Sequence, residues 1–314
     1  MTVSRAEGPL LSVVVPVWNR AALVRRCLDS VLAQAFHDYE LIAVDDGSTD
    51  GSLDVIAGVL DPRLRVVARG ENGGTWAART AGVREARGAW IMFLDSDDEL
   101  KPGALAFFSE KAGAAPPAVG VLGGSYRDRD GNVWPDPPPP EGTMGLERFL
   151  AWADSLVRAD FLAVYRREVF DTVHAPQGFA IGTLFDLEIF GRWEKLVFSE
   201  ICGTVGTDAP NRQTGRGATF STENFLRRAE ACAAAEEEVL RRYGEALRRH
   251  APRRMLATRA RAGIYALAAG HRYRGAAHLA RYLARRPASP GAWAFLVAGL
   301  IGPQALAAMR RALG

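Results

Sequence analysis

The sequence predicts an α/β fold, with a mainly parallel sheet flanked by helices and a helical region at the C-terminal end. Three observations predict it. Over residues 10–94, short apolar runs alternate with segments of helical length, which is the pattern of βαβ units. Two of those runs end directly in acidic clusters. From Phe225 onward the chain is rich in Ala, Arg and Leu and carries no strand signal.

The first strand and helix follow from the spacing of apolar residues. Residues 10–15 (LLSVVV) form a continuous apolar run, as expected of a strand that is buried on both faces. Asn19 is expected to cap a helix whose apolar positions over 23–35 recur at helical spacing. Residues 40–44 (ELIAV) are predicted to form the second strand, which ends at Asp45.

The alternation continues beyond the first acidic cluster. A short helix is expected over 52–60, a strand over 64–68 and a further helix over 75–86. The run 90–94 (WIMFL) is predicted to be a fourth strand, which ends at Asp95. Because ligands of open α/β sheets bind at the carboxyl ends of the strands, both acidic clusters lie where a ligand is expected.

The second half of the chain carries weaker signals. We expect a helix after Pro102 and a strand over 118–122, followed by a polar, proline-rich surface loop over 126–141. Residues 143–220 mix helix, strand and a stretch rich in Gly, Asn and Arg.

Composition narrows the class of protein. A hydrophobic content of 48% and a charged content of 24% are typical of soluble globular proteins. The three cysteines are far apart without CxxC spacing, and no HExxH motif is present, so we predict neither disulfides nor a thiolate-bound zinc. The longest C-terminal apolar run, 292–301, is shorter than the roughly 20 residues that span a bilayer. We therefore expect a cytoplasmic protein, at most peripheral on the inner face of the plasma membrane.

Charge is distributed unevenly along the chain. Residues 226–314 hold 17 arginines and 5 acids, whereas residues 1–225 hold 22 basic and 31 acidic residues. A basic C-terminal region indicates either an anionic membrane surface as partner or a set of solvated helix faces. The apolar residues of 293–301 suit a membrane surface, but packing within the protein or between subunits explains them equally well. Aromatic residues do not interleave with these arginines, so we exclude nucleic acid as a partner.

The acidic clusters suit a phosphorylated ligand with a divalent cation. Asp95 and Asp97 flank Ser96 on a turn, so their carboxylates can converge on one hard cation such as Mg²⁺ or Mn²⁺. A solvated loop or a helix cap is the alternative for this turn. Asp45 and Asp46 precede Gly47, which permits close approach of a ligand, but they also suit an ordinary helix cap.

A third segment carries the features of a phosphate-binding loop. Asn72 and Gly73 belong to a glycine-containing loop that leads into a helix, and Arg79 lies about one turn inside that helix. A plain turn with a surface arginine is the alternative.

Four segments together resemble family 2 glycosyltransferases, which have the GT-A fold. They are VVVPVWN (13–19), DDGSTD (45–50), NGGTWAARTAG (72–82) and FLDSDDELKP (93–102), in this order and spacing. The resemblance is strong over about 10–105 and weaker from there to about 220. One departure is Thr80, where many members have Asn.

The resemblance implies an inverting, metal-dependent transfer of a sugar from a nucleoside-diphosphate sugar to a hydroxyl acceptor. The donor would be UDP-, GDP- or dTDP-linked, the acceptor a saccharide, glycolipid or protein, and the metal Mg²⁺ or Mn²⁺. In the family the second acid of the DDGS-like pair contacts the base, which maps onto Asp46, and the DxD element maps onto Asp95 and Asp97, with Asp98 close by as a third candidate metal ligand. The remaining donor-binding positions that we assign are Pro16, Val17, Asn19, Asp45, Asn72, Gly73, Arg79, Ser96 and Arg212. Arg212 lies in a glycine- and arginine-containing segment, 211–217, which either closes on the diphosphate or has no role.

The catalytic base is expected in the acceptor half. Many members of the family carry a Glu-Asp pair followed six residues later by Arg. Here Asp186 keeps that spacing to Arg192, while Phe185 replaces the Glu. Asp186 is therefore the predicted base and Glu188 the alternative, with a purely structural acid on a helix as the third interpretation.

These assignments give a domain division and two rival functions. We expect a GT-A catalytic domain over 1–222, with a nucleotide-binding half over about 1–105 and an acceptor half over about 106–222, and a helical region over 223–314. Synthesis of cell-surface polysaccharide or glycolipid is the expected setting, by family analogy. The rivals are a sugar-phosphate nucleotidyltransferase and a non-catalytic membrane-docking or scaffold protein that keeps the fold.

Overall fold

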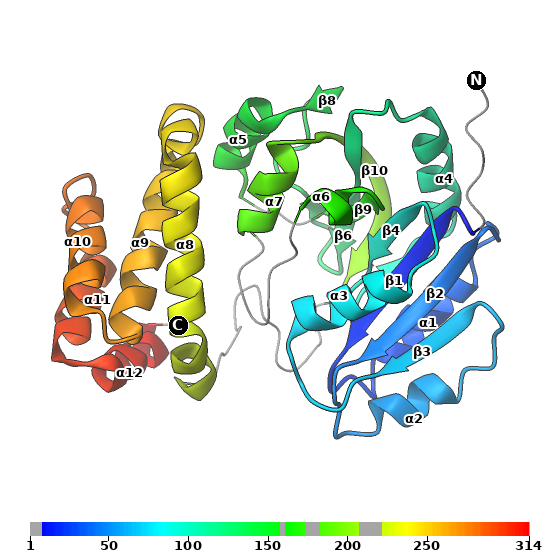
Figure 1. Ribbon diagram of the computed structural model, residues 1–314, viewed down its shortest axis with the longest axis horizontal. Coiled ribbons are helices and arrows are strands. Elements are labelled where there is room, and N and C mark those ends of the chain that lie inside the picture. Colours follow the sequence, from blue (N-terminus) through cyan, green and yellow to red (C-terminus); the bar gives the residue numbers. More distant parts are fainter. Residues whose placement is uncertain (1–7, 158–160, 174–182, 207–221, 314) are drawn as a thin grey trace. The chain divides into compact units, whose positions relative to one another are not determined.

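The computed structural model describes residues 8–157, 161–173, 183–206 and 222–313 (Figure 1). The chain divides into two compact units. The first, which we call the sheet unit, comprises Met1–Gly178 and Glu188–Ala209. The second, the helical unit, comprises Phe179–Leu187 and Pro210–Gly314.

The sheet unit is built on a ten-stranded sheet whose main path runs β3-β2-β1-β4-β9-β6-β10-β5 (Figure 1). The four strands predicted in the first half are present and parallel: β1 (Leu11–Val17), β2 (Tyr39–Asp45), β3 (Leu64–Ala68) and β4 (Trp90–Phe93). β9 (Leu162–Arg166) runs antiparallel between β4 and β6 (Val119–Asp128), and β10 (Glu194–Val205) is parallel to β6. Three two-residue strands pair antiparallel with the sheet, namely β5 (Glu99–Leu100), β7 (Val133–Trp134) and β8 (Thr143–Met144). This mixed, mainly parallel sheet confirms the predicted fold class.

Within the described residues, seven helices accompany the strands, and the first four occur in the predicted order. They are α1 (Val24–Leu32), α2 (Ser52–Ala57), α3 (Thr75–Glu85), α4 (Ala104–Ala114), α5 (Leu146–Ser155), α6 (Val169–Thr172) and α7 (Thr183–Phe190). α7 contains the boundary between the two units. α3 crosses close over β1, since a Cβ on Gly82 would lie 2.3 Å from Cγ1 of Val14. A glycine at this crossing therefore lets the helix that carries Arg79 rest directly on the sheet.

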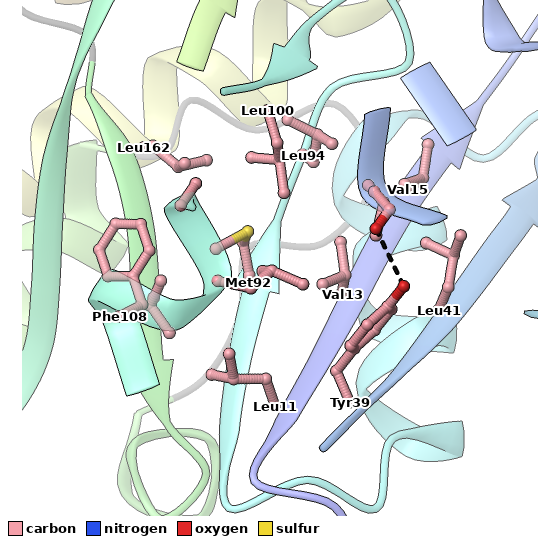
Figure 2. Packing of buried hydrophobic residues seen from close by; sticks show 14 of the residues in the cluster. Leu11, Val13, Val15, Tyr39, Leu41, Met92, Leu94, Leu100, Phe108 and Leu162 are labelled. Carbon is pink, nitrogen blue, oxygen red and sulfur yellow. Dashed lines mark hydrogen bonds between the residues drawn. The ribbon is translucent and has the colours of Figure 1, made fainter. Parts of the chain in front are cut away.

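The core of the sheet unit surrounds β1, every residue of which is buried. Figure 2 shows Val13 of β1 between Leu41 of β2 and Met92 of β4, and Leu11 and Val15 of the same strand belong to the same cluster. Each fully buried aliphatic side chain contributes about 1.5–3 kcal/mol relative to exposure. The strand ends at the edge of the sheet are thus held by a well-packed interior.

Two expectations about the sheet unit are wrong. Asn19 does not cap the first helix, because α1 begins at Val24 and its N-cap residue, Leu23, makes no side-chain capping bond. Asn19 instead has a left-handed backbone (φ 52°), and its side-chain oxygen accepts a hydrogen bond from the N–H of Thr49 at 2.8 Å.

The second error concerns the predicted surface loop over 126–141. β6 continues through Asp128 because its second half pairs with β10 and with β7. The Asp128 carboxylate then organises the turn by accepting bonds from the N–H of Asn132 (2.8 Å) and the indole of Trp134 (3.3 Å).

The helical unit confirms the predicted helical C-terminal region. It consists mainly of α8 (Thr222–His250), α9 (Pro252–Ala268), α10 (Arg272–Leu283), α11 (Pro290–Ile301) and α12 (Pro303–Leu313). Proline begins three of these helices, a position where its missing N–H costs nothing. Small residues allow tight packing around Leu267, since a Cβ on Gly299 would lie 2.4 Å from its Cδ1. Among the described helices, none has both the length and the apolar character needed to cross a bilayer.

Candidate active site

The two acidic clusters lie at the same edge of the sheet, on either side of β1. Asp45 ends β2 in register with Val17 at the end of β1. On the other side β4 ends at Phe93, in register with Val14, and the N–H of Leu94 donates to the Val14 carbonyl at 3.1 Å. The parallel register therefore places the segments after β2 and β4 next to the end of β1.

Pro16 lies in β1 just beyond its pairing with β4, which ends at Val14. Hydrogen-bonding groups of a strand alternate in direction, so Pro16, like Val14, faces the side of β4. A proline, which has no N–H to donate, is tolerated at this position because β4 no longer pairs with β1 there. The last residues of β1 are consequently open towards the segment that follows β4.

The loop after β1 is tied to the first acidic cluster. Asn19 donates its N–H to the hydroxyl of Ser48 at 3.0 Å, and the N–H of Ala21 donates to the Asp50 carboxylate at 3.0 Å. Burial raises the pKa of Asp50, but its hydrogen bonds from Ser52 and Ala21 outweigh that effect and hold the pKa below its usual value. The hydrogen bonds of Asn19 to Ser48 and Thr49 account for its left-handed backbone. They join two loops that are far apart in the sequence.

Asp46 is buried, and both of its carboxylate oxygens are engaged. Oδ1 accepts a bond from Nη1 of Arg69 and from the N–H of Gly73 at 3.2 Å. Oδ2 accepts a bond from the N–H of Gly74 at 2.7 Å. Asp46 thus holds the loop of Asn72 and Gly73 against the sheet edge and fixes the start of α3.

Asp45 is also buried, but only one of its oxygens has a donor. Oδ2 accepts the N–H of Ser48 at 3.1 Å, whereas Oδ1 has no hydrogen-bond partner within the described part of the chain. A buried acceptor without a donor costs on the order of 1–3 kcal/mol. Asp45 Oδ1 is therefore an open acceptor next to the end of β1.

Gly47 lets two loops meet. Its φ is +72°, and a Cβ there would lie 2.8 Å from the carbonyl carbon of Glu71 and 2.9 Å from the amide nitrogen of Asn72. Both the backbone conformation and the close approach require glycine. The loop after β3 is consequently packed directly on the first acidic cluster.

The second acidic cluster is more exposed and is paired with the predicted phosphate-binding arginine. The side chain of Asp95 is 48% exposed, and its Oδ1 accepts a bond from Nη2 of Arg79 at 2.7 Å. The guanidinium of Arg79 lies 5.2 Å from the ring centres of both Trp76 and Phe93. These rings hold the arginine flat at the sheet edge.

The turn that contains Asp97 is fastened to the end of β10. Asp98 donates its N–H to the Asp95 carbonyl at 2.9 Å and accepts the N–H of Gly206 through Oδ1 at 2.8 Å. A Cβ on Gly206 would lie only 2.0 Å from the Asp97 carbonyl oxygen, so only glycine fits there. Ser96 is buried within this turn. Residues 207–221, with the predicted donor-binding residue Arg212, lie outside the described residues.

A buried thiol lies beneath the same turn. Sγ of Cys27 is 3.5 Å from the Asp95 carbonyl oxygen. Burial, and then the negative charges of Asp98, Asp97, Asp95 and Glu99, raise the pKa of Cys27 well above its usual value. Four carboxylates thus concentrate negative potential at one turn, which a bound cation would neutralise.

The donor set of this turn fits a divalent metal that is also bound by a ligand's phosphates. Among the described residues, no group of three or more His, Cys, Asp or Glu side chains is arranged to hold a metal by itself. Mg²⁺ and Mn²⁺ sites at phosphates commonly use only one or two protein carboxylates. Asp95 and Asp97 meet that requirement, whereas one oxygen of Asp98 already accepts the Gly206 N–H.

The predicted base lies on α7, which contains both candidates. Glu188 belongs to the sheet unit and Asp186 to the helical unit, so the role of Asp186 stays a prediction. Within the sheet unit the end of α7 is held by Phe190, whose ring stacks on Phe149 at 3.8 Å between centres. The ammonium of the buried Lys195 lies 5.0 Å from the Phe190 ring centre.

Arg69, the partner of Asp46, was not among the residues predicted from the sequence. It follows β3 directly, and its N–H donates to the Asp45 carbonyl at 2.9 Å. Its position directly after a predicted parallel strand could have indicated a place at the site, because β3 ends at the same edge of the sheet as β1 and β2.

Comparisons with a protein family and with individual proteins all find glycosyltransferases or proteins of polysaccharide synthesis. The family described as Glycosyl transferase family 2 matches residues 12–173. The chain is 40% identical over 113 residues to the succinoglycan biosynthesis protein ExoO of Rhizobium meliloti, covering 36% of this chain and 32% of that protein. It is 34% identical over 170 residues to a PGL/p-HBAD biosynthesis glycosyltransferase of Mycobacterium tuberculosis, covering 53% of this chain and 62% of the relative. The chain thus spans less than two thirds of the length of either relative.

Two solved structures share the fold. The mannosyltransferase PcManGT from Pyrobaculum calidifontis, in complex with GDP-Man and Mn²⁺, has a TM-score of 0.55 and 21% identity, covering 94% of this chain and 80% of that one. Residues 1–349 of S. aureus TarS, in complex with UDP-GlcNAc, have a TM-score of 0.56 and 17% identity, covering 96% of this chain and 92% of that one.

The contact of Gly47 with the loop after β3 predicts a difference between two glycine substitutions. Gly47→Ala is expected to lower the free energy of unfolding by about 2–5 kcal/mol, from left-handed strain together with overlap on the 71–72 backbone. Gly51→Ala is the matched control, because Gly51 has a similar φ of +86° but open space around its Cβ position. It should cost only about 1–2 kcal/mol. Urea unfolding measures both, and equal losses would contradict the described contact.

Proposed function

Because this chain belongs to glycosyl transferase family 2, we propose that it transfers a sugar from a nucleoside-diphosphate sugar to a hydroxyl group of an acceptor. The observation that carries the proposal is the meeting of two acidic clusters at one sheet edge, on either side of the end of β1. A nucleotide and a metal-bound diphosphate need acidic groups of this kind, one set to accept hydrogen bonds and the other to bind a cation.

The nucleoside is proposed to bind between the ends of β1 and β2. The open acceptor Asp45 Oδ1 supports this placement, as do the nearby residues Pro16, Val17 and Asn19. Asp46 is the family's base-contacting position, and here its carboxylate also holds Arg69 and the Gly73–Gly74 amides. We therefore assign Asp46 to the nucleotide site together with the loop that it fixes.

The diphosphate is proposed to bind at the second acidic cluster. Asp95 and Asp97 would hold Mg²⁺ or Mn²⁺, which when bound neutralises charge on the diphosphate leaving group. The GDP-Man complex of the similar mannosyltransferase contains Mn²⁺, which is consistent with this assignment. Arg79, stacked beside Asp95, is placed to donate to a phosphate oxygen in exchange for its bond to that carboxylate.

The acceptor hydroxyl is proposed to lose its proton to Asp186, with Glu188 as the alternative base. The hydroxyl oxygen would attack the anomeric carbon on the face opposite the diphosphate, so the configuration at that carbon is inverted. Asp186 lies in the first turn of α7, and its assignment is supported by the family spacing to Arg192.

Polysaccharide or glycolipid assembly is the proposed setting, on the cytoplasmic side of the membrane. The relative in Rhizobium is named for succinoglycan biosynthesis and the one in Mycobacterium for PGL/p-HBAD biosynthesis. A nucleotidyltransferase is disfavoured, because Pro16 to Asn19 stand where such an enzyme usually has a glycine-rich basic loop.

A peripheral membrane contact is proposed through one face of α11. Trp293, Val297, Leu300 and Ile301 recur at helical spacing and are 49%, 57%, 47% and 70% exposed. Arg272 donates to the carbonyl of Ile301 at 3.4 Å, which places a cation at one end of this stripe. An apolar stripe beside arginine suits an anionic membrane surface.

Calorimetry with UDP, GDP and dTDP tests the donor site. At least one of them should bind in the presence of Mn²⁺ and bind much more weakly without it. Asp97→Asn should weaken the metal-dependent binding by about tenfold or more, since a carboxylate ligand is lost. Asp54→Asn on the exposed face of α2 is the control and should bind as the unmodified protein does. Absence of metal-dependent binding to all three nucleotides would reject the proposed function.

The base is tested by Asp186→Asn. This variant should keep metal-dependent nucleotide binding and lose transfer by about 10²–10⁴-fold, because the amide cannot accept the hydroxyl proton. Glu188→Gln is the comparison, with transfer assayed on the same donor and acceptor. Full transfer by Asp186→Asn would move the role to Glu188 or to another residue.

Vesicle flotation tests the membrane contact. The protein should bind vesicles that contain phosphatidylglycerol, and Val297→Asp with Ile301→Asp should weaken binding at least about tenfold through loss of apolar burial. The matched control is Leu60→Asp with Val157→Asp, which adds the same charge at exposed apolar residues of the sheet unit. Equal binding by the two double variants would contradict the assignment of α11.

A further inference from the structure

Three arginines of the helical unit gather without an acidic partner. They are Arg259 on α9, Arg281 on α10, and Arg285 in the turn that follows the end of α10 at Leu283. None of them has an ion pair or a side-chain hydrogen bond to any residue that the structure describes. Most other arginines of these helices are paired, so this group is a local excess of positive charge.

The packing of α9 on α10 brings the three arginines together. A Cβ on Gly263 would lie 3.2 Å from the Cβ of His278 and 2.8 Å from Cγ of Leu279, so the two helices touch there. Arg259 lies one turn before Gly263 on the same face of α9. Arg281 lies one turn after His278 on α10, and Arg285 follows in the turn at the end of the helix, where its N–H donates to the Tyr282 carbonyl at 3.0 Å.

The acidic side chains of the neighbouring helix α8 that the structure describes already form ion pairs with other residues. Glu237 binds Nη2 of Arg274 at 2.6 Å and lies 3.3 Å from Nε2 of His278. The remaining described acids of α8 pair elsewhere, Glu230 with His271, Glu236 with Arg261, Glu238 with Arg241 and Glu245 with Arg249. None of these carboxylates compensates the three arginines.

Arg259 also carries a polar atom that needs an acceptor. Its Nε is buried and has no hydrogen-bond partner in the described part of the chain. Burial, followed by the charges of Arg281 and Arg285, lowers the pKa of Arg259. The positive charges of Arg281 and Arg285 thus act on Arg259, and the buried Nε donor of Arg259 is left unused. Such an arrangement is stabilised by a bound anion.

We propose that Arg259, Arg281 and Arg285 form a binding site for a phosphate or diphosphate group. Guanidinium forks match the oxygens of a phosphate in pairs, and three of them can bind a dianion. The group belongs either to a soluble phosphate or to the headgroup of a phospholipid. The site lies wholly within the helical unit and does not depend on the proposed sugar transfer.

The test uses the full chain with inorganic phosphate and pyrophosphate, measured by calorimetry in EDTA so that no divalent metal takes part. Arg281→Gln with Arg285→Gln should weaken binding by about tenfold or more, as two charged forks are lost. This variant should fold at least as well as the parent, because it removes repulsion. Arg241→Gln with Arg249→Gln is the matched control, since it removes two exposed charges that are paired with acids on α8.

Flotation with vesicles of phosphatidylcholine, with and without phosphatidylglycerol, distinguishes the two sources of phosphate. Loss of soluble-anion binding in the Arg281 and Arg285 variant, with retention in the control, supports a soluble ligand. Loss of vesicle binding alone, again with retention in the control, supports a lipid headgroup. The α11 stripe variant should still bind soluble phosphate. Absence of binding in both assays, or equal binding by the two double variants, would overturn the proposal.

Discussion

The parallel pairing of β1 with β2 on one side and β4 on the other is the constraint on which the sheet edge depends. It aligns the ends of three strands, and the complete burial of β1 holds them rigid. Parallel strands need covering on both faces, and α3 meets that need by resting on Val14 through Gly82. The same contact carries Arg79 to the edge. Packing in the interior and placement of polar groups at the surface therefore have one cause.

The two acidic clusters use their carboxylates differently. Both carboxylate oxygens of Asp46 accept hydrogen bonds from the loop after β3, and Asp50 accepts hydrogen bonds from the loop after β1. The first cluster therefore mainly holds neighbouring loops in place. Its one open acceptor is Oδ1 of Asp45. Asp95 in the second cluster is half-exposed and has a single arginine as its described side-chain partner. Such a carboxylate can exchange partners at low cost, whereas a braced one cannot. This difference is consistent with the proposal of a rigid nucleoside site beside an adaptable site for phosphate and cation.

β1, β2 and β4 could be predicted because each is a short, mainly apolar run whose residues are all buried. The error at Asn19 has a physical cause, since its hydrogen bonds go to Ser48 and Thr49, about 30 residues away, and no local rule contains that contact. β6 was predicted too short because its second half is stabilised by β10, some 75 residues later in the chain. The members of both clusters could be named from sequence, but the Arg69 bond that occupies Asp46 depends on tertiary proximity. The roles of Asp186 and Glu188 rest on spacing alone.

The burial of Cys27 beneath the acidic turn has a consequence for reactivity. The thiolate is the nucleophilic form of cysteine, and here burial and four carboxylates disfavour it. Cys202 and Cys232 are also free and buried, and burial raises their pKa values to about 12 and about 11. The folded chain should therefore be inert to alkylating reagents and mild oxidants although it contains three thiols. A cysteine introduced at the surface would be the sole reactive thiol, so probes could be attached at a chosen position without first removing the native ones.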